Sequence, residues 1–338
     1  MVYVAGSIET SDDWCQCMDV LETKNLRKFF PIRTGFIFPK VTFLRAVDAV
    51  DISVKQGEIM GLAGESGCGK STLGKLILGL LRPDAGEIFF NGKPVVDFDR
   101  SFRRQTGIVF QDPFESLNPR KNIFDTLAKP ITFHKISGTK ESVQARVADL
   151  LSIVGLTPPD KFMYRHPHEL SGGQRQRVAI ARAIAANPIF IVADEPVSAL
   201  DVSVRAQILS LFKDLQRKLD LAFMLITHEL AVLRSLAQRV SIMYLGQIVE
   251  VGETRSVFER PRHPYTEALL SATPIPDPKV ARARHHVILK GEPPSPIDPP
   301  SGCHFHTRCP YAKATCSSIE PLLESREGRT YRCHYPLS

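Results

Sequence analysis

Apolar and polar positions alternate along the chain with two periods, one typical of strands and one typical of helices. Alternation over residues 20–30 and 46–54 predicts two strands of a small antiparallel layer. Short apolar runs predict further strands that are buried on both faces, over residues 59–63, 189–193, 222–226 and 239–244. Helical patterns lie between them, over residues 70–81, 142–154, 171–186 and 202–219. The pattern therefore predicts an α/β fold whose mostly parallel sheet is flanked by helices.

The same pattern predicts three parts of the chain. Residues 1–19 are polar and irregular and are expected to form an N-terminal tail. Residues 20–260 contain the predicted strands and form one domain, with a helical subdomain over about residues 113–186. Prolines crowd the stretch from 274 to 300, which is typical of a linker, so residues 261–338 are expected to form a small C-terminal module.

Composition limits the kinds of protein that this chain can be. Its 338 residues are 43% hydrophobic, which is enough to build a core. No stretch approaches the roughly 18 consecutive apolar residues of a membrane span, and the first residues lack a secretory signal, so we expect a cytosolic protein. The net charge of +7 is spread over scattered lysines and arginines, so a nucleic-acid partner is only a second choice.

Residues 64–71 match the phosphate-loop spacing G-x-x-x-x-G-K-[ST] between a predicted strand and a predicted helix. Glycines let successive backbone N–H groups approach phosphate oxygens, and the helix N-terminus adds positive potential. Lys70 supplies a cation for the β and γ phosphates, and the Ser71 hydroxyl is a ligand for Mg²⁺. The predicted nucleotide contacts of this segment are Gly64, Glu65, Ser66, Gly67, Cys68, Gly69, Lys70, Ser71 and Thr72.

Two acidic residues follow the apolar run 189–193. Asp194, at the end of the predicted strand, is expected to hold Mg²⁺ directly or through water. Glu195 is the natural general base, because a carboxylate beside the γ-phosphate can orient and deprotonate an attacking water. The alternative is a solvated strand end without a catalytic role.

The segment Leu170-Ser171-Gly172-Gly173-Gln174 lies at the start of a predicted helix. Its hydroxyl and backbone N–H groups can donate to a phosphate, yet the loop at 64–71 already holds the phosphates in this chain. A glycine-rich helix cap is the alternative. The phosphate loop, this segment and the acidic pair occur in an order that resembles the nucleotide-binding subunits of ABC transporters.

This resemblance covers residues 20–260 and implies a P-loop NTPase fold of the ABC type, with ATP and Mg²⁺ as ligands. It also implies that Ser171, Gly172, Gly173 and Gln174 cap ATP held by a partner subunit in a head-to-tail dimer. Since every motif is intact, the chain is expected to hydrolyse ATP.

Four further matches to the family assign roles by resemblance. Gln111 resembles the Q-loop glutamine that senses Mg²⁺ and water next to the subdomain that touches the membrane partner. Asp201 resembles the D-loop aspartate, which passes between the two sites, and His228 resembles the switch histidine that contacts the γ-phosphate. Phe30 is the predicted adenine-stacking side chain, with Phe29 as the alternative.

Segments 110–119, 194–203, 263–266 and 291–296 resemble oligopeptide and dipeptide importer ATPases, and residues 28–32 with Val197 favour the F-type subunit. One departure is an insertion over residues 33–44. The resemblance implies peptide import, together with a sister ATPase, two transmembrane permeases and an extracytoplasmic peptide-binding protein. The chain would then be peripheral, on the cytoplasmic face of the inner membrane. Nickel, glutathione or oligosaccharide cargo stays open, and a soluble nucleic-acid-associated ATPase of the same fold is less favoured.

Four cysteines near the C-terminus are spaced C-x5-C-x6-C-x16-C, at Cys303, Cys309, Cys316 and Cys333. Thiolates gathered in a reducing compartment are candidate metal ligands. Zinc sites favour tighter C-x2-C pairs, whereas the resemblance to peptide-importer ATPases implies a 4Fe–4S cluster. Zinc and uncommitted thiols remain alternatives. The other cysteines, Cys15, Cys17 and Cys68, have no such arrangement.

Overall fold

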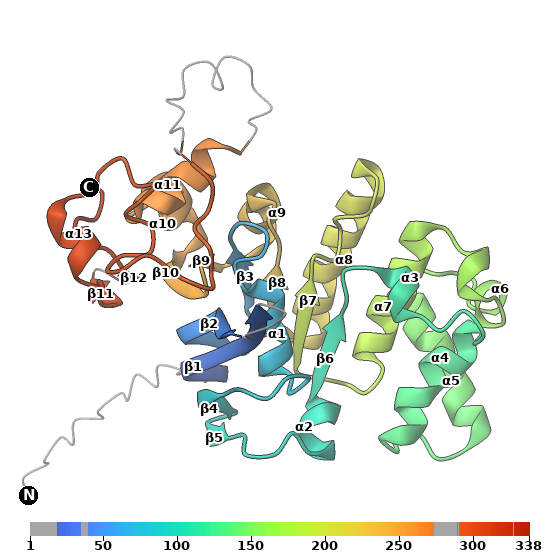
Figure 1. Ribbon diagram of the computed structural model, residues 1–338. Helices are drawn as coiled ribbons and strands as arrows, with labels where there is room; N and C mark the ends of the chain where they lie inside the picture. The colour runs from blue at the N-terminus through green and yellow to red at the C-terminus, as the bar shows by residue number, and fades with distance from the viewer. Residues whose placement is uncertain (1–18, 35–39, 274–288, 290, 327) are drawn as a thin grey trace, which may run out of the picture.

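Two β-sheets and the helices around them make up the computed structural model, which describes residues 19–34, 40–273, 289, 291–326 and 328–338 (Figure 1). One sheet has four strands in the order β2-β1-β4-β5, and the other has eight in the order β11-β12-β10-β9-β3-β8-β7-β6. The predicted tail, apart from its last residue, and Cys15 and Cys17 lie outside the described residues.

The smaller sheet is the predicted antiparallel layer. It consists of β1 (Asp19–Thr34), β2 (Lys40–Lys55), β4 (Ala85–Phe90) and β5 (Lys93–Pro94). The strands β1 and β2 are longer than predicted, because the insertion over residues 33–44 continues their pairing, with Ile32 opposite Thr42. The described part of the insertion therefore extends an existing hairpin.

The larger sheet carries the site on the ends of its parallel strands. Its parallel members are β6 (Thr106–Val109), β7 (Phe190–Asp194), β8 (Ala222–Ile226), β3 (Ile59–Ala63) and β9 (Arg239–Tyr244). The antiparallel strands β10 (Gln247–Glu253), β12 (Arg329–Tyr331) and β11 (Glu324–Arg326) extend it at one edge. The strands β3 and β8 are buried at every position, as their apolar runs predict.

Helices cover both faces of this sheet, with two clusters of buried apolar side chains beneath them. They are α1 (Lys70–Ile77), α2 (Arg100–Gln105), α8 (Val202–Leu219), α9 (Leu230–Leu236), α10 (Thr254–Glu259) and α11 (Pro264–Ser271). The predicted end of α1 at residue 81 is wrong. Gly79 adopts a left-handed φ of 65°, which ends the helical hydrogen bonding. None of the described helices is long and apolar enough to cross a bilayer.

The helical subdomain lies to one side of the sheet, beyond β6 and β7 (Figure 1). It contains α3 (Pro113–Ser116), α4 (Ile123–Phe133), α5 (Lys140–Ile153), α6 (Asp160–Met163), the 3₁₀ helix η1 (Pro167–Glu169) and α7 (Gly172–Ile184). Side chains of Asn122, Thr139 and Ser171 cap α4, α5 and α7 by accepting backbone N–H bonds.

The C-terminal residues pack against the edge of the larger sheet, near β9 and β10 (Figure 1). They contain α13 (Ala314–Ser318) and the two short strands β11 and β12, of which β12 pairs with β10. Phe305 is 1% exposed and belongs to one of the two clusters of buried apolar side chains, together with residues of β3, β7 and β8. The described C-terminal residues therefore share the core of the larger sheet. The predicted domain limits stay a prediction.

Candidate functional site

The phosphate loop joins β3 to α1 and passes close to the backbone of β2 and β9. Gly64, Gly67 and Gly69 have φ values of 158°, 77° and 110°. A Cβ on Gly64 would come within 2.2 Å of the Met243 carbonyl oxygen, and one on Gly69 within 2.0 Å of the Ala46 carbonyl oxygen. Both positions therefore require glycine, for packing as well as for conformation.

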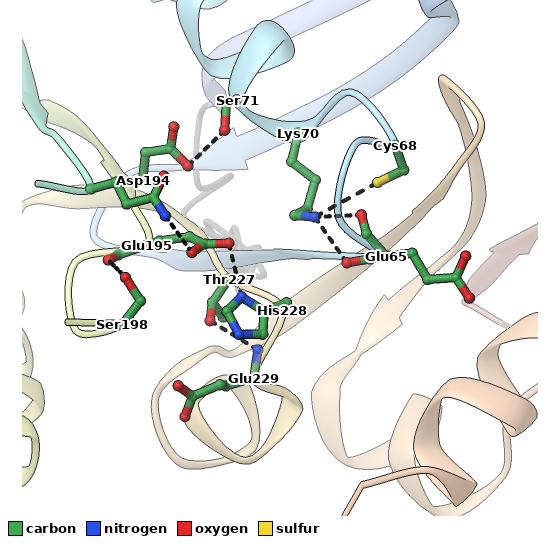
Figure 2. A network of polar contacts seen from close by, with 12 residues as sticks. Glu65, Cys68, Lys70, Ser71, Asp194, Glu195, Ser198, Thr227, His228 and Glu229 are labelled. Carbon is green, nitrogen blue, oxygen red and sulfur yellow. Dashed lines mark hydrogen bonds and ion pairs between the residues drawn. The ribbon is translucent and has the colours of Figure 1, made fainter. Parts of the chain in front are cut away.

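Lys70 is buried at the base of this loop. Its Nζ donates to the carbonyl oxygens of Gly64, at 2.9 Å, and Glu65, at 2.8 Å (Figure 2). Its Nζ also lies 3.8 Å from the sulfur of Cys68, a thiol whose pKa is raised by burial. The ammonium is thus held inside the loop that is predicted to bind phosphate.

Ser71 and Asp194 meet where α1 begins and β7 ends. The Ser71 hydroxyl donates to Oδ1 of Asp194 at 3.1 Å. Burial raises the pKa of Asp194, and the hydrogen bond from Ser71 opposes that rise. A hydroxyl beside a carboxylate is an oxygen donor set that suits Mg²⁺.

The Glu195 side chain lies between those of Gln111 and His228. Glu195 follows the parallel strand β7, Gln111 follows β6 and His228 follows β8. The Gln111 Nε2 donates to Oε2 of Glu195 at 3.0 Å, and the His228 Nδ1 lies 2.9 Å from Oε1 (Figure 2). The backbone of Glu195 has a left-handed φ of 43°, and its N–H donates to the Ile226 carbonyl at 2.9 Å. The structure therefore brings together three residues that lie far apart in the sequence.

One pocket connects the phosphate loop, Gln111, Glu195 and His228 to the strands β1 and β2, whereas Asp194 lines a second pocket that shares Ser71 and Gln111 with it. Phe30, Leu44 and Ala46 line it on the strand side. The phosphate loop and the catalytic candidates line the rest, with Ser66, Gly67, Gly69, Lys70, Ser71, Thr72, Gln111, Glu195 and His228. Phe29 is not among the described residues that line the pocket. Its backbone N–H donates to the Asp84 carboxylate. The structure places Phe30, the first choice for adenine stacking, at the pocket.

The segment 171–174 is not among the described residues that line this pocket. Ser171 is exposed, and it forms a capping box in which its hydroxyl accepts from the Gln174 N–H at 3.3 Å. Asp201 is also exposed, at the N-terminal boundary of α8. The candidates for contact with a second nucleotide thus lie apart from the pocket of their own chain.

Two contacts of the phosphate loop were not predicted. The Glu65 N–H donates to the Tyr265 hydroxyl at 2.9 Å, and the Arg308 guanidinium binds the Glu65 carboxylate at 3.1 and 3.2 Å. Tyr265 lies in a segment that the family resemblance singled out. Nothing in the sequence connects either residue to a loop about 200 positions upstream.

The four C-terminal cysteines line one pocket, although they come from a turn, from α13 and from the segment after β12. Burial raises the pKa of Cys303, of Cys309 to about 11 and of Cys333 to about 12. Among the residues that the structure describes, no three His, Cys, Asp or Glu side chains are arranged to hold a metal ion. The sequence prediction of a metal centre therefore receives no direct support from ligand geometry.

Comparison with known proteins identifies the family. A model described as "ABC transporter" matches residues 47–198, and one described as "Oligopeptide/dipeptide transporter, C-terminal region" matches residues 249–316. The oligopeptide transport ATP-binding protein AppF of Bacillus subtilis is 44% identical over 93% of this chain and 97% of its own length. The chain belongs to this family of transporter ATP-binding proteins. OppF and DppF of Escherichia coli are 43% and 42% identical, each over 93% of the chain and over 95% and 93% of their own lengths.

Solved structures support the fold. CbiO1 from Clostridium perfringens, part of the ABC transporter complex cbiONQ, superposes with a TM-score of 0.60 at 26% identity, covering 72% of this chain and 91% of its own. The dimeric bacterial ABC transporter cassette MJ0796 also gives a TM-score of 0.60, at 30% identity, over 70% of this chain and 99% of its own. The predicted family, the ABC-type ATPase fold and the ATPase activity are confirmed.

Proposed function

We propose that this protein is the F-type ATPase subunit that powers import of oligopeptides or dipeptides through an ABC transporter. The observation that carries the proposal is the pocket in which the phosphate loop meets Gln111, Glu195 and His228. Similarity to the named oligopeptide and dipeptide transport proteins extends over more than nine-tenths of the chain and supports the cargo class.

The residues present fit ATP and Mg²⁺. The loop N–H groups and Lys70 would hold the phosphates, and Phe30 would stack on the adenine. Ser71, Asp194 and Gln111 would hold Mg²⁺, which supplies charge compensation at the phosphate oxygens.

Hydrolysis at this site requires a base that is already oriented. The Glu195 carboxylate accepts a proton from the attacking water, while Gln111 and His228 hold its two oxygens in place. Lys70 would contact the transferred phosphoryl group in place of the loop carbonyls, and His228 would contact the γ-phosphate. Hydrolysis would be coupled to transport if the reaction could occur only while a second ATPase subunit covers the nucleotide.

That second subunit is proposed to be a sister ATPase, in a head-to-tail heterodimer docked on two permeases. The exposed Ser171 and Asp201, which do not serve their own pocket, support a composite site. The solved MJ0796 structures are dimeric, one of them with ADP and phosphate bound. An extracytoplasmic peptide-binding protein would deliver the cargo, and the subunit would lie on the cytoplasmic face of the inner membrane.

The assembled complex tests the cargo class. In proteoliposomes that contain the subunit, its sister ATPase, both permeases and the binding protein, a labelled di- or tripeptide should accumulate only with ATP. Uptake of nickel, glutathione or an oligosaccharide in place of peptide would leave the ATPase assignment intact and contradict the proposed peptide cargo. Nucleic-acid-stimulated ATPase activity without permeases would favour the soluble alternative.

The four cysteines are proposed to bind one 4Fe–4S cluster in a small Cys-rich C-terminal module. Their common pocket supports this, because it brings together four cysteines that lie apart in the sequence. A single Zn²⁺ needs all ligand atoms about 2.3 Å from one point, whereas a cluster spreads its ligands over four irons. The proposal of a cluster rests on the shared pocket and on the family resemblance, and zinc stays the alternative.

Anaerobically purified protein is expected to be brown and to contain about four irons per chain. Cys309→Ser should bleach the protein and loosen the C-terminal residues, since metal binding contributes folding free energy. Cys68→Ser, which removes a thiol outside this pocket, is the matched control for colour. Iron content and visible absorption check the result, and stoichiometric zinc in a colourless sample would replace the cluster with a zinc site.

Phe30→Ala should weaken ATP binding by the purified chain roughly tenfold, because stacking on a base contributes about 1–3 kcal/mol. Phe29→Ala is the matched control, since this neighbouring ring does not line the pocket. Equilibrium titration with a fluorescent ATP analogue measures both variants. Equal losses at the two positions would remove Phe30 from the adenine site.

A further inference from the structure

Glu65, in the phosphate loop, is held by all three of its polar groups. Its carbonyl oxygen accepts from Lys70 within the loop. Its backbone N–H donates to the Tyr265 hydroxyl at 2.9 Å, and its carboxylate is bound by Arg308. Two of these three anchors come from the residues after position 260, outside the elements predicted to bind nucleotide.

The Arg308 contact is a forked ion pair with little exposure to water. Its Nη1 lies 3.2 and 3.1 Å from the two carboxylate oxygens of Glu65, and its Nη2 lies 3.2 Å from Oε1. The Arg308 side chain is 8% exposed and that of Glu65 is 29% exposed. A bidentate pair of this kind fixes orientation as well as distance, which a lysine cannot do.

Buried aromatic rings support both anchors. Tyr265 lies 4.5 Å from Tyr244 and 5.4 Å from Phe305 between ring centroids, and each of the three is at most 1% exposed. Burial raises the pKa of Tyr265, so its hydroxyl stays protonated. The anchors are therefore built on a packed layer between the larger sheet and the C-terminal residues.

We propose that Arg308 is a positioning residue for ATP binding, which acts by holding Glu65 and thereby the phosphate loop. This inference rests on the proposed nucleotide site. The N–H groups of the loop must converge on phosphate, and an anchored loop loses less conformational freedom when the ligand binds. In the absence of Arg308, the Glu65 carboxylate would lose this partner, and of the two described anchors from the residues after position 260 the loop would keep Tyr265.

The same anchor joins the loop to the cysteine pocket. Arg308 lies in the turn between Cys303 and Cys309, where its N–H donates to the Phe305 carbonyl at 3.0 Å. The next residue, Cys309, lines the pocket with the other three thiols. The turn that carries Cys303 and Cys309 is therefore also the turn that holds the guanidinium against the phosphate loop.

The test compares ATP affinity in purified full-length variants. Arg308→Ala should weaken binding of a fluorescent ATP analogue about tenfold, which corresponds to about 1.4 kcal/mol. Arg308→Lys should restore part of the lost affinity, because an ammonium group keeps the positive charge but cannot form the bidentate contact with the carboxylate. Arg326→Ala is the matched control, since it removes an exposed C-terminal ion pair with Glu324 and should leave affinity unchanged.

A cycle with Glu65 separates positioning from general stability. If Arg308 acts through Glu65, the double variant Arg308→Ala/Glu65→Gln should bind ATP no more weakly than the worse single variant. In the assembled complex, Arg308→Ala should raise KM for ATP more than it lowers kcat. If Arg308→Ala does not fold, Glu65→Gln alone must still bind the ATP analogue more weakly than wild type.

Wild-type affinity in Arg308→Ala, or additive losses in the double variant, would overturn this inference and leave the ATPase assignment intact. Failure of the wild-type chain to bind the analogue would overturn the proposed nucleotide site itself.

Discussion

Glu195→Gln is expected to abolish ATP turnover while the chain still binds ATP. The amide has the shape of the carboxylate and can still accept from Gln111, but it cannot take a proton from water. Removal of a positioned general base commonly costs about 10² to 10⁴-fold in rate. Because Lys70, Ser71 and Phe30 are untouched, the affinity for nucleotide should remain near that of wild type.

Steady-state hydrolysis by the assembled complex, measured together with analogue binding by the isolated variant, separates the two effects. Glu259→Gln is the control, because it neutralises an exposed carboxylate that pairs with Arg255 away from the pocket. Turnover of Glu195→Gln within a factor of two of wild type would assign the base to another residue.

Sequence patterns predicted the buried parallel strands well, for a simple physical reason. The run 222–226 is apolar throughout and the run 239–244 is mostly apolar, and the structure has strands with these bounds. The antiparallel strand β10 was missed, since its sequence mixes charged and apolar residues and its pairing depends on β9 and β12. Long-range pairing of this kind leaves little signal in a short window.

The ends of elements were predicted less well. Helix α1 stops before its apolar pattern does, because Gly79 takes a left-handed conformation. The insertion 33–44 had no predicted structure, and much of it continues the hairpin of β1 and β2. In both cases the structure depends on backbone conformation or strand pairing, which hydrophobic periodicity does not predict.

The site was predictable where spacing alone determines chemistry. Close backbone contacts require glycine at Gly64 and Gly69, so this part of the motif is visible as a local sequence pattern. The resemblance assigned roles to Gln111 and His228, but their hydrogen bonds to Glu195 depend on a strand order that no local pattern predicts. The contact of Arg308 with Glu65 spans 243 positions and has no local signature.

In the proposed composite site, a complete set of motifs would not be sufficient for activity in one chain. The described pocket holds the phosphate loop and the catalytic carboxylate, but Ser171 lies on an exposed surface outside it. Gly172 and Gly173 differ in their surroundings. A Cβ on Gly173 would come within 2.4 Å of Val204, whereas one on Gly172 would meet only Leu200, at 3.7 Å. Gly172 can therefore be changed without disturbing the fold.

The purified chain alone is expected to hydrolyse ATP slowly, and co-assembly with its sister ATPase and permeases should raise the rate sharply. Gly172→Asp should remove most of that increase, because a carboxylate would face the phosphates of the partner's nucleotide. Gly138→Asp is the matched control, since a Cβ there meets no atom within 4 Å and the position is exposed. Phosphate release is measured against protein concentration for each variant, with thermal unfolding to confirm that both fold. Fast, concentration-independent hydrolysis by the monomer would exclude a composite site, because a single chain would then supply every group that the reaction needs.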